Sequence, residues 1–415
     1  MKTIFPKDFY AYGIHCGIKK NGKKDLSLFF SSVPCVAAAM FTKNIFQAAP
    51  VKVSRSHVKN NISAIIANSG CANACTGERG MEDAEQMCGI TAANLGLKTG
   101  NILVASTGVI GGFLPMKKVA LGIKKLTCFV KSSQIDKNSG SVVSGCDDSC
   151  PRSQNSPISA VEGIMTTDTF PKQAFSSFKI NGRTVNIWGC AKGSGMIEPN
   201  LATMLSFILT DADIEKAALN NALQRAAEIS FNALTVDGDT STNDTLILLA
   251  NGSAGNKKIL SGGNFNIFCR ELEKVCMQLT KMLAADGEGA TKLIEINVTG
   301  AKTMNDARRI AKTVANSPLV KTAVFGNDAN WGRILAAVGR SGVPVVPEKM
   351  SISFGNLRVF NAGVPAHFSE SKAKKILSGK EVAINIFLNL GSKRAKVITC
   401  DFTEGYIKIN ASYRS

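Results

Sequence analysis

Short apolar runs alternate with longer amphipathic segments along almost the whole chain, and this alternation restricts the fold more than any other feature. A short apolar run bounded by turn residues is typical of a buried strand, and apolar residues every three or four positions are typical of a helix. The strand-like runs are Leu26–Phe30, Ser63–Ala67, Ile102–Ala105, Leu246–Ala250, Leu293–Val298, Glu381–Leu388, Ala395–Cys400 and Gly405–Asn410. The helix-like segments are Met81–Leu95, Met116–Val130, Ile214–Ile229, Phe265–Ala285 and Gly300–Asn316. We therefore predict an α+β fold without internal repeats.

Turn-forming residues indicate where the chain reverses direction. Asn181-Gly182 and Gly355-Asn356 each separate two short strand-like runs, which is a hairpin signal. Residues 131–156 are rich in Ser, Asn, Gly and Asp, a composition typical of an exposed loop or insertion.

Composition indicates a large globular protein. The 415 residues suggest two or three domains or lobes. Hydrophobic residues make up 45% of the chain and charged residues 19%, which is typical of a globular protein. No apolar run approaches the roughly 20 residues that a membrane helix needs, and Met1–Pro6 has no signal-peptide core and no Arg/Ser-rich presequence. We expect a cytoplasmic protein that has no membrane partner.

Cysteine usage argues against a metal site. The chain has twelve cysteines and three histidines, but it has no Cys-x-x-Cys motif. The pairs Cys71/Cys75 and Cys146/Cys150 are each spaced four apart, and no histidine is near them in the sequence. A structural zinc site normally combines such pairs with further Cys or His ligands. We therefore predict no metal site and reduced thiols, many of them buried.

The net charge of +18 raises the question of a nucleic-acid partner. Lys and Arg are spread along the chain in short clusters, without a zinc finger, a basic arm or an RNA-binding aromatic signature. We expect a solvated, lysine-rich surface and no nucleic-acid partner, with some attraction for acidic small molecules.

The segment Lys192–Leu205 has the clearest potential for chemistry. It is polar and Gly-rich, and it leads into an apolar run that continues to Leu209, so Thr203 stands at the leading edge of a predicted strand. If the Ala202–Thr203 peptide bond is cut, Thr203 becomes an N-terminus with a nucleophilic hydroxyl. Its α-amine, with a reference pKa of about 7.7–8.0, can then act as the base. On residue types alone, an ordinary strand-edge threonine is the simpler interpretation.

Thr107 and Gly108 follow an apolar strand. A hydroxyl and a backbone N–H in such a turn can point two donors at one oxyanion, although a plain strand-to-loop turn has the same residues. Lys192 lies in a Gly-rich loop, where lysines are commonly solvated, and the order of its neighbours does not fit a phosphate-binding loop.

Two acidic segments also need an interpretation. Asp286 and Glu288 end a predicted helix, where they could form a solvated cap or a metal site. Asp237 and Asp239 resemble the start of a calcium loop, but Thr242 stands where an EF-hand needs Gly. Asx-turn hydrogen bonding is the better interpretation for the Asp237 segment.

Taken together, these motifs resemble the ornithine acetyltransferase family, the self-cleaving glutamate N-acetyltransferases of arginine biosynthesis. The resemblance runs from Gly13 to the last residue. The segments that carry it are Gly13–Lys19, Asn68–Gly77, Ser106–Gly111, Met165–Thr169, Lys192–Leu205, Thr235–Asp244 and Gly326–Arg333. Two positions depart from the usual pattern, with Cys71 in place of Asn and Ala329 in place of Pro.

The resemblance implies helices layered around packed mixed sheets, and cleavage into an α chain (1–202) and a β chain (203–415). It implies that Thr203 is the nucleophile, that Ala202 and Thr203 flank the cleaved bond, and that Thr107 and Gly108 stabilise the oxyanion. The substrate contacts that it implies are Thr166 (or its neighbour Thr167), Lys192, Thr203, Glu288, Asn410 and Ser415.

The implied reaction is acetyl transfer from N²-acetylornithine to glutamate through an acetyl-threonine ester. No cofactor or metal is implied, although acetyl-CoA would be a co-substrate of a bifunctional member. The implied partners are the small-molecule substrates and the chain's own two products, assembled as an α2β2 heterotetramer. Two other functions stay open at this point: an N-terminal-nucleophile amidohydrolase or aminopeptidase, and a basic nucleic-acid-binding protein.

Overall fold

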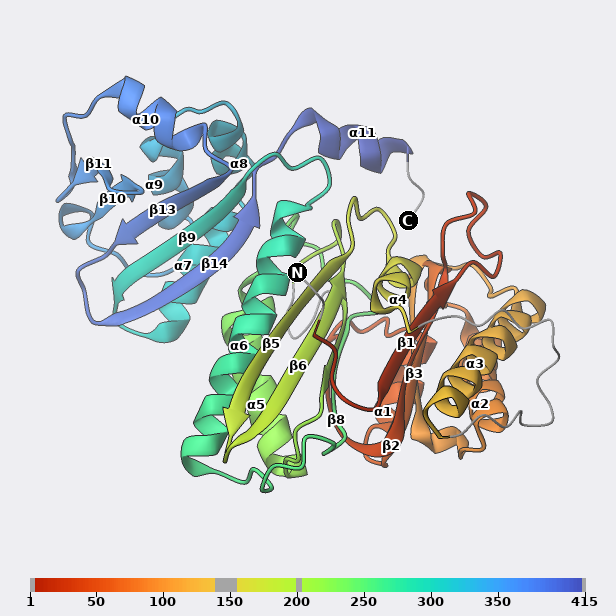
Figure 1. The fold of residues 1–415 in the computed structure, drawn as a ribbon. Helices are drawn as coiled ribbons and strands as arrows, with labels where there is room; N and C mark the ends of the chain where they lie inside the picture. The colour runs from red at the N-terminus through yellow and green to blue at the C-terminus, as the bar shows by residue number, and fades with distance from the viewer. Residues whose placement is uncertain (1–3, 139–154, 199–203, 413–415) are drawn as a thin grey trace.

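The computed structural model describes residues 4–138, 155–198 and 204–412, and its strands form two separate sheets (Figure 1). The larger sheet has eight strands in the order β4-β3-β2-β8-β7-β6-β5, with β1 paired to β2. Its strands are β1 (Phe9–Ile14), β2 (Leu26–Phe41), β3 (Ile62–Cys71), β4 (Ile102–Val109), β5 (Lys172–Ile180), β6 (Arg183–Lys192), β7 (Leu205–Thr210) and β8 (Thr245–Ala250). The long β2 joins two halves of this sheet, because its first part pairs with β3 and its last part with β8.

The two halves of the larger sheet pack face to face. Phe29 of β2, Trp188 of β6 and Phe207 of β7 are fully buried between them, and the Phe29 and Phe207 rings lie 5.1 Å apart. Helices cover the outer face of each half, which gives four layers, and α4 (Pro157–Ile164) contributes to the core between the halves. The helices of this unit are α1 (Ala49–His57), α2 (Gly77–Leu95), α3 (Met116–Asn138), α4 (Pro157–Ile164), α5 (Lys216–Ile229) and α6 (Gly262–Ala285), with short 3₁₀ turns η1 (Thr99–Asn101) and η2 (Phe231–Ala233).

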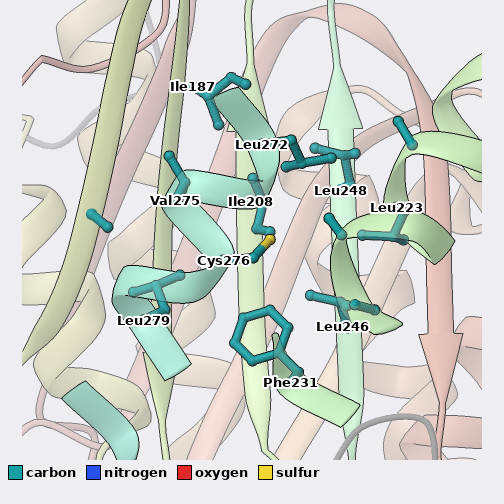
Figure 2. Close-up of a cluster of buried hydrophobic side chains, with 14 of the residues drawn as sticks. Ile187, Ile208, Leu223, Phe231, Leu246, Leu248, Leu272, Val275, Cys276 and Leu279 are labelled. Atoms are coloured by element: carbon teal, nitrogen blue, oxygen red, sulfur yellow. The ribbon is translucent and has the colours of Figure 1, made fainter. Parts of the chain in front are cut away.

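Helix α6 shows why these segments fold as they do. Its apolar residues recur at helical spacing and face Ile187, Ile208 and Leu248 of the sheet (Figure 2). The residues on this stripe are Phe268, Leu272, Val275, Leu279 and Leu283, all fully buried. Burial of each such side chain stabilises the fold by roughly 1.5–3 kcal/mol.

The smaller sheet lies in the C-terminal part and has the order β12-β11-β10-β13-β9-β14. Its strands are β9 (Leu293–Ala301), β10 (Ser351–Phe354), β11 (Leu357–Asn361), β12 (Val364–Pro365), β13 (Glu381–Phe387) and β14 (Lys393–Cys400). The helices around it are α7 (Met304–Ala315), α8 (Pro318–Phe325), α9 (Trp331–Gly339) and α10 (Glu370–Leu377), with the 3₁₀ turn η3 (Pro347–Lys349). A separate core, made of buried residues from the smaller sheet and from the helices around it, holds this unit together.

The structure confirms the α+β prediction, the layered arrangement and both hairpins. Asn181 and Gly182 take positive φ values of 48° and 78° between β5 and β6, as a two-residue hairpin turn requires. Helix α3 continues to Asn138, so only residues beyond it could belong to the predicted loop, and 139–154 lie outside the described residues. No helix in the described ranges combines the length and apolarity that a membrane span requires.

The predicted strand Gly405–Asn410 is wrong, because this segment forms helix α11 (Glu404–Ser412). No residue of α11 is buried, so its backbone groups are best satisfied by intrahelical hydrogen bonds. The helix begins where the Thr403 hydroxyl accepts a hydrogen bond from Gly405 N, and the Phe402 and Tyr406 rings lie 4.6 Å apart across its first turn. The alternating apolar residues misled the prediction because the segment adds to neither sheet.

Candidate active site

Six of the predicted site residues line one pocket of about 110 Å³ in the larger unit. These are Thr107, Gly108, Thr166, Lys192, Glu288 and Asn410. Met204, which directly follows the predicted nucleophile, also lines the pocket. Ala202, Thr203 and Ser415 lie outside the described residues.

The ends of four strands define this pocket. Lys192 is the last residue of β6 and pairs with Leu205, the first residue of β7. Leu205 in turn pairs with Thr245, the first residue of the parallel strand β8. The fourth strand, β4, is tied to this edge by the Asn243 side chain, whose Nδ2 donates to the carbonyls of Ala72 (2.6 Å) and Ser106 (2.8 Å). The two halves of the sheet therefore meet at the site with fixed spacing.

Gly108 is held in a conformation that only glycine tolerates. Its φ is 130°, and an added Cβ would lie 2.4 Å from the carbonyl carbon of Gly70 on β3. Thr107 beside it is 7% exposed and lines the pocket together with Gly108. The end of β4 is therefore rigid and presents both residues to the pocket.

Lys192 reaches into the site from the end of β6. It is 9% exposed, and its Nζ donates to the Thr166 hydroxyl at 3.1 Å. Burial lowers the pKa of Lys192, while the nearby carboxylates of Asp168, Asp244 and Glu288 act in the opposite direction. Thr166 and Thr167 both line the pocket, but the Thr167 hydroxyl is engaged with the Ser194 hydroxyl at 2.6 Å. Thr166 is thus the threonine that shares a surface with Lys192.

A buried ion triad that sequence reasoning missed supports these residues. Lys172 Nζ lies 2.6 Å from Asp168 Oδ1 and 2.5 Å from Asp286 Oδ2, and all three side chains are almost fully buried. Asp168 also accepts hydrogen bonds from the backbone N–H groups of Thr166 (2.9 Å) and Gly193 (2.8 Å). Burial disfavours the charged carboxylate, but Lys172 and Lys192 hold the pKa of Asp168 below its ordinary value. The triad therefore fixes the positions of Thr166 and Gly193, which both line the pocket.

The C-terminal helix α11 closes the opposite side. Asn410 Nδ2 donates to Glu288 Oε2 at 2.8 Å, and Glu288 N donates to the Ser194 carbonyl at 2.8 Å. Gly195 packs against this carboxylate so closely that an added Cβ would lie 2.4 Å from Glu288 Oε2. Glu288 is thereby fixed between the Gly-rich loop and the tail.

Asp237 holds the Gly-rich loop where the described residues stop. Its carboxylate accepts hydrogen bonds from the backbone N–H groups of Met196 (2.6 Å) and Ile197 (2.8 Å), and from the Tyr406 hydroxyl (3.3 Å). Asp239 N also donates to it, at 3.3 Å, which confirms the Asx-turn interpretation. Asp237 therefore joins the loop to α11.

Asp244 is a second buried acid that the sequence did not single out. It lines the pocket, is 2% exposed, and its Oδ2 has no hydrogen-bond partner among the described residues. Burial raises the pKa of Asp244 well above its ordinary value, with Lys192 acting against this shift. The site thus contains a carboxyl group that tends to keep its proton.

Comparison with known proteins identifies the family. The ArgJ family model matches residues 10–415. The chain is 47% identical over 414 residues to the arginine biosynthesis bifunctional protein ArgJ of Symbiobacterium thermophilum, covering 99% of this chain and 98% of that protein. It is 44% identical over 416 residues to the protein of the same name from Geobacillus kaustophilus, covering 100% and 96%.

The chain belongs to the ArgJ family. Among solved structures, it is similar to the ArgJ protein of Bacillus halodurans, with 42% identity and a TM-score of 0.49. That match covers 50% of this chain and 98% of the other. The family model and the two relatives confirm the family resemblance noted in the sequence.

The residues missed by sequence reasoning had weak signals. Asp168 lay inside a segment noted for its resemblance, and Asp286 was considered only as a cap or metal ligand. Lys172 gave no signal, because a lysine four residues after Asp168 is indistinguishable in the sequence from an exposed one, and its second partner, Asp286, is 114 residues away. Within the described residues, no group of three or more His, Cys, Asp and Glu side chains is arranged to hold a metal.

Proposed function

We propose that this chain is a self-processing acetyltransferase of arginine biosynthesis, which moves an acetyl group from N²-acetylornithine to glutamate. The observation that carries the proposal is the convergence of Thr107, Gly108, Lys192, Glu288 and Asn410 on one pocket lined also by Met204. The relatives at 44–47% identity are named as arginine biosynthesis proteins, which favours acyl transfer over the hydrolase and nucleic-acid-binding alternatives.

The first step is cleavage of the chain. The Thr203 hydroxyl attacks the Ala202 carbonyl, the Ala202–Thr203 peptide bond breaks as an ester forms, and water hydrolyses the ester. The products are an α chain, 1–202, with a new carboxylate and a β chain, 203–415, with a free α-amine. We propose that both remain associated as an α2β2 heterotetramer in the cytoplasm.

Acetyl transfer then proceeds in two halves. The Thr203 oxygen bonds to the acetyl carbon of N²-acetylornithine while its proton passes to the Thr203 amine. The Thr107 hydroxyl and the Gly108 N–H stabilise the resulting oxyanion. The intermediate collapses, and the ornithine nitrogen leaves with the proton from the Thr203 ammonium. The amine of glutamate attacks the acetyl ester, and its departure as N-acetylglutamate returns the hydroxyl to Thr203.

The remaining pocket residues hold the amino-acid part of the substrate. Lys192 supplies a cation for a carboxylate, and the Thr166 hydroxyl beside it supplies a hydrogen bond. The fixed Glu288 carboxylate suits the charged side-chain amine of ornithine, with Asn410 and Ser415 contributing from the tail. We propose that the reaction needs no metal and no organic cofactor. We also propose acetyl-CoA as a second acetyl donor, because the relatives are named as bifunctional.

The test is product analysis with purified protein. Incubation with N²-acetylornithine and glutamate is expected to yield ornithine and N-acetylglutamate in equal amounts. Release of acetate without any dependence on glutamate would instead identify a hydrolase and overturn the proposal.

A further inference from the structure

A second cavity, of about 830 Å³, lies between the two sheet units and outside the site described above. One wall comes from the end of α5 and from η2, which belong to the larger unit. The other wall comes from α7, β9 and β14 of the smaller unit. Its volume falls within the range of about 300–1,000 Å³ that is usual for small-molecule sites.

The lining is strongly basic. Six cationic side chains face it, namely Lys43, Arg308, Arg309, Lys312, Arg394 and Lys396, against one carboxylate, Glu228. Arg308, Lys312 and Lys396 have acidic partners, which are Glu228, Glu198 and Glu295. Within the described ranges, Lys43, Arg309 and Arg394 have no ion pair. Three uncompensated cations around one cavity favour an anionic occupant.

Two further features indicate the chemistry of that occupant. Met304 and Asn305, in the first turn of α7, line the cavity, and the positive end of the helix dipole adds to the cations there, although the Thr303 cap and Asp306 in the same turn satisfy part of it. The same cavity has apolar surface, since Ile229 is 46% exposed and Met304 is 43% exposed. Exposed apolar side chains beside cations suit a ligand that has both phosphates and a flat ring.

We propose that this cavity binds a multiply phosphorylated nucleoside, with its phosphates on Arg309, Arg394 and Lys43. At the edge of the cavity, Lys312 Nζ lies 3.4 Å from Oε1 of Glu198, a residue of the Gly-rich segment 192–205. Two sources have the required chemistry: the nucleotide end of the acetyl-CoA donor, or a free nucleotide that acts as a regulator. The identification of the ligand as acetyl-CoA rests on the proposed function, whereas the binding of a phosphorylated nucleoside to this cavity does not.

The test is calorimetric titration with adenosine 3′,5′-bisphosphate, using adenosine and pyrophosphate as partial probes. Binding is expected for the bisphosphate, weaker binding for pyrophosphate, and none for adenosine at the same concentration. Arg394→Glu and Arg309→Glu are each expected to weaken the affinity for the bisphosphate by about tenfold to a hundredfold. This is the range for loss of a hydrogen bond to a charged group. Lys375→Glu on α10 is the control, because it makes the same charge change outside the cavity.

Kinetics then separate the two sources. If the ligand is the acetyl donor, Arg394→Glu raises KM for acetyl-CoA and leaves transfer from N²-acetylornithine unchanged. If the ligand is a regulator, neither KM changes, but added nucleotide alters the rate of the wild type and not of the variant. Absence of binding, or equal binding by wild type and both cavity variants with native-like circular dichroism, would overturn the proposal whether or not acetyl transfer is observed.

Discussion

Lys172 offers a sharp test of how the active-site pocket is held. Lys172→Met keeps much of the side-chain volume but removes the cation between Asp168 and Asp286, whose side chains are 0% and 2% exposed. Removing one partner of a buried ion pair costs about 3–5 kcal/mol, because the remaining charge is left uncompensated. We expect the free energy of unfolding at pH 7 to fall by about that amount in urea denaturation.

The pH dependence gives this prediction a sign. In the wild type the pKa of Asp168 is lowered, so its contribution to stability is present above the unfolded value of about 3.9 and is lost as the pH falls through the lowered pKa. In Lys172→Met the largest of the influences that lower the pKa of Asp168 is gone, so we expect burial to raise this pKa relative to the wild type. The folded variant then gains a proton as the pH falls, so the destabilisation relative to wild type should be smaller at pH 5 than at pH 7.

Lys179→Met is the matched control, because Lys179 lies on the same strand, β5, and is exposed. An exposed substitution of this kind usually changes stability by less than about 0.5 kcal/mol. If Lys172→Met is as stable as Lys179→Met at pH 7, the triad does not support the pocket and the reasoning is refuted.

Three further predictions concern the reaction. Thr107→Ala should lower kcat by about 10²–10³ with little change in KM, as for loss of one oxyanion donor, and should also slow cleavage; normal turnover would reduce Thr107 to a structural residue. Removal of residues 410–415 frees Glu288 from Asn410 and should raise KM for N²-acetylornithine while cleavage proceeds; an unchanged kcat/KM would remove the tail from the site. Initial rates with both substrates varied should give parallel double-reciprocal lines, as a covalent intermediate requires, whereas intersecting lines would indicate direct transfer.

Much of the fold could be predicted because its signals are local. The Asn181-Gly182 turn and the apolar stripe of α6 are each determined within a few turns of chain. The full length of β2 could not be read from its apolar residues, since residues 36–41 pair with β8, more than 200 positions away. Helix α11 was missed because its alternating apolar residues resemble a strand, whereas the segment pairs with neither sheet and none of its residues is buried.

The site divides in the same way. Lys192 and Thr107 belong to motifs with a specific order of residues, so their pocket could be anticipated from a resemblance. The triad around Lys172 arises from burial and from a contact between distant segments, and so does the buried Asp244 carboxyl, whose Oδ2 has no hydrogen-bond partner among the described residues. Neither property can be predicted from residue types, because the sequence does not distinguish a buried Lys or Asp from an exposed one.

The most direct test of the central claim is the mass of the purified protein before and after incubation with N²-acetylornithine in the absence of glutamate. We predict two chains, 1–202 and 203–415, with one acetyl group gained by the second chain only, and a single uncut chain for Thr203→Ala. A wild-type protein that transfers acetyl groups as one intact, unmodified chain of 415 residues would contradict the account.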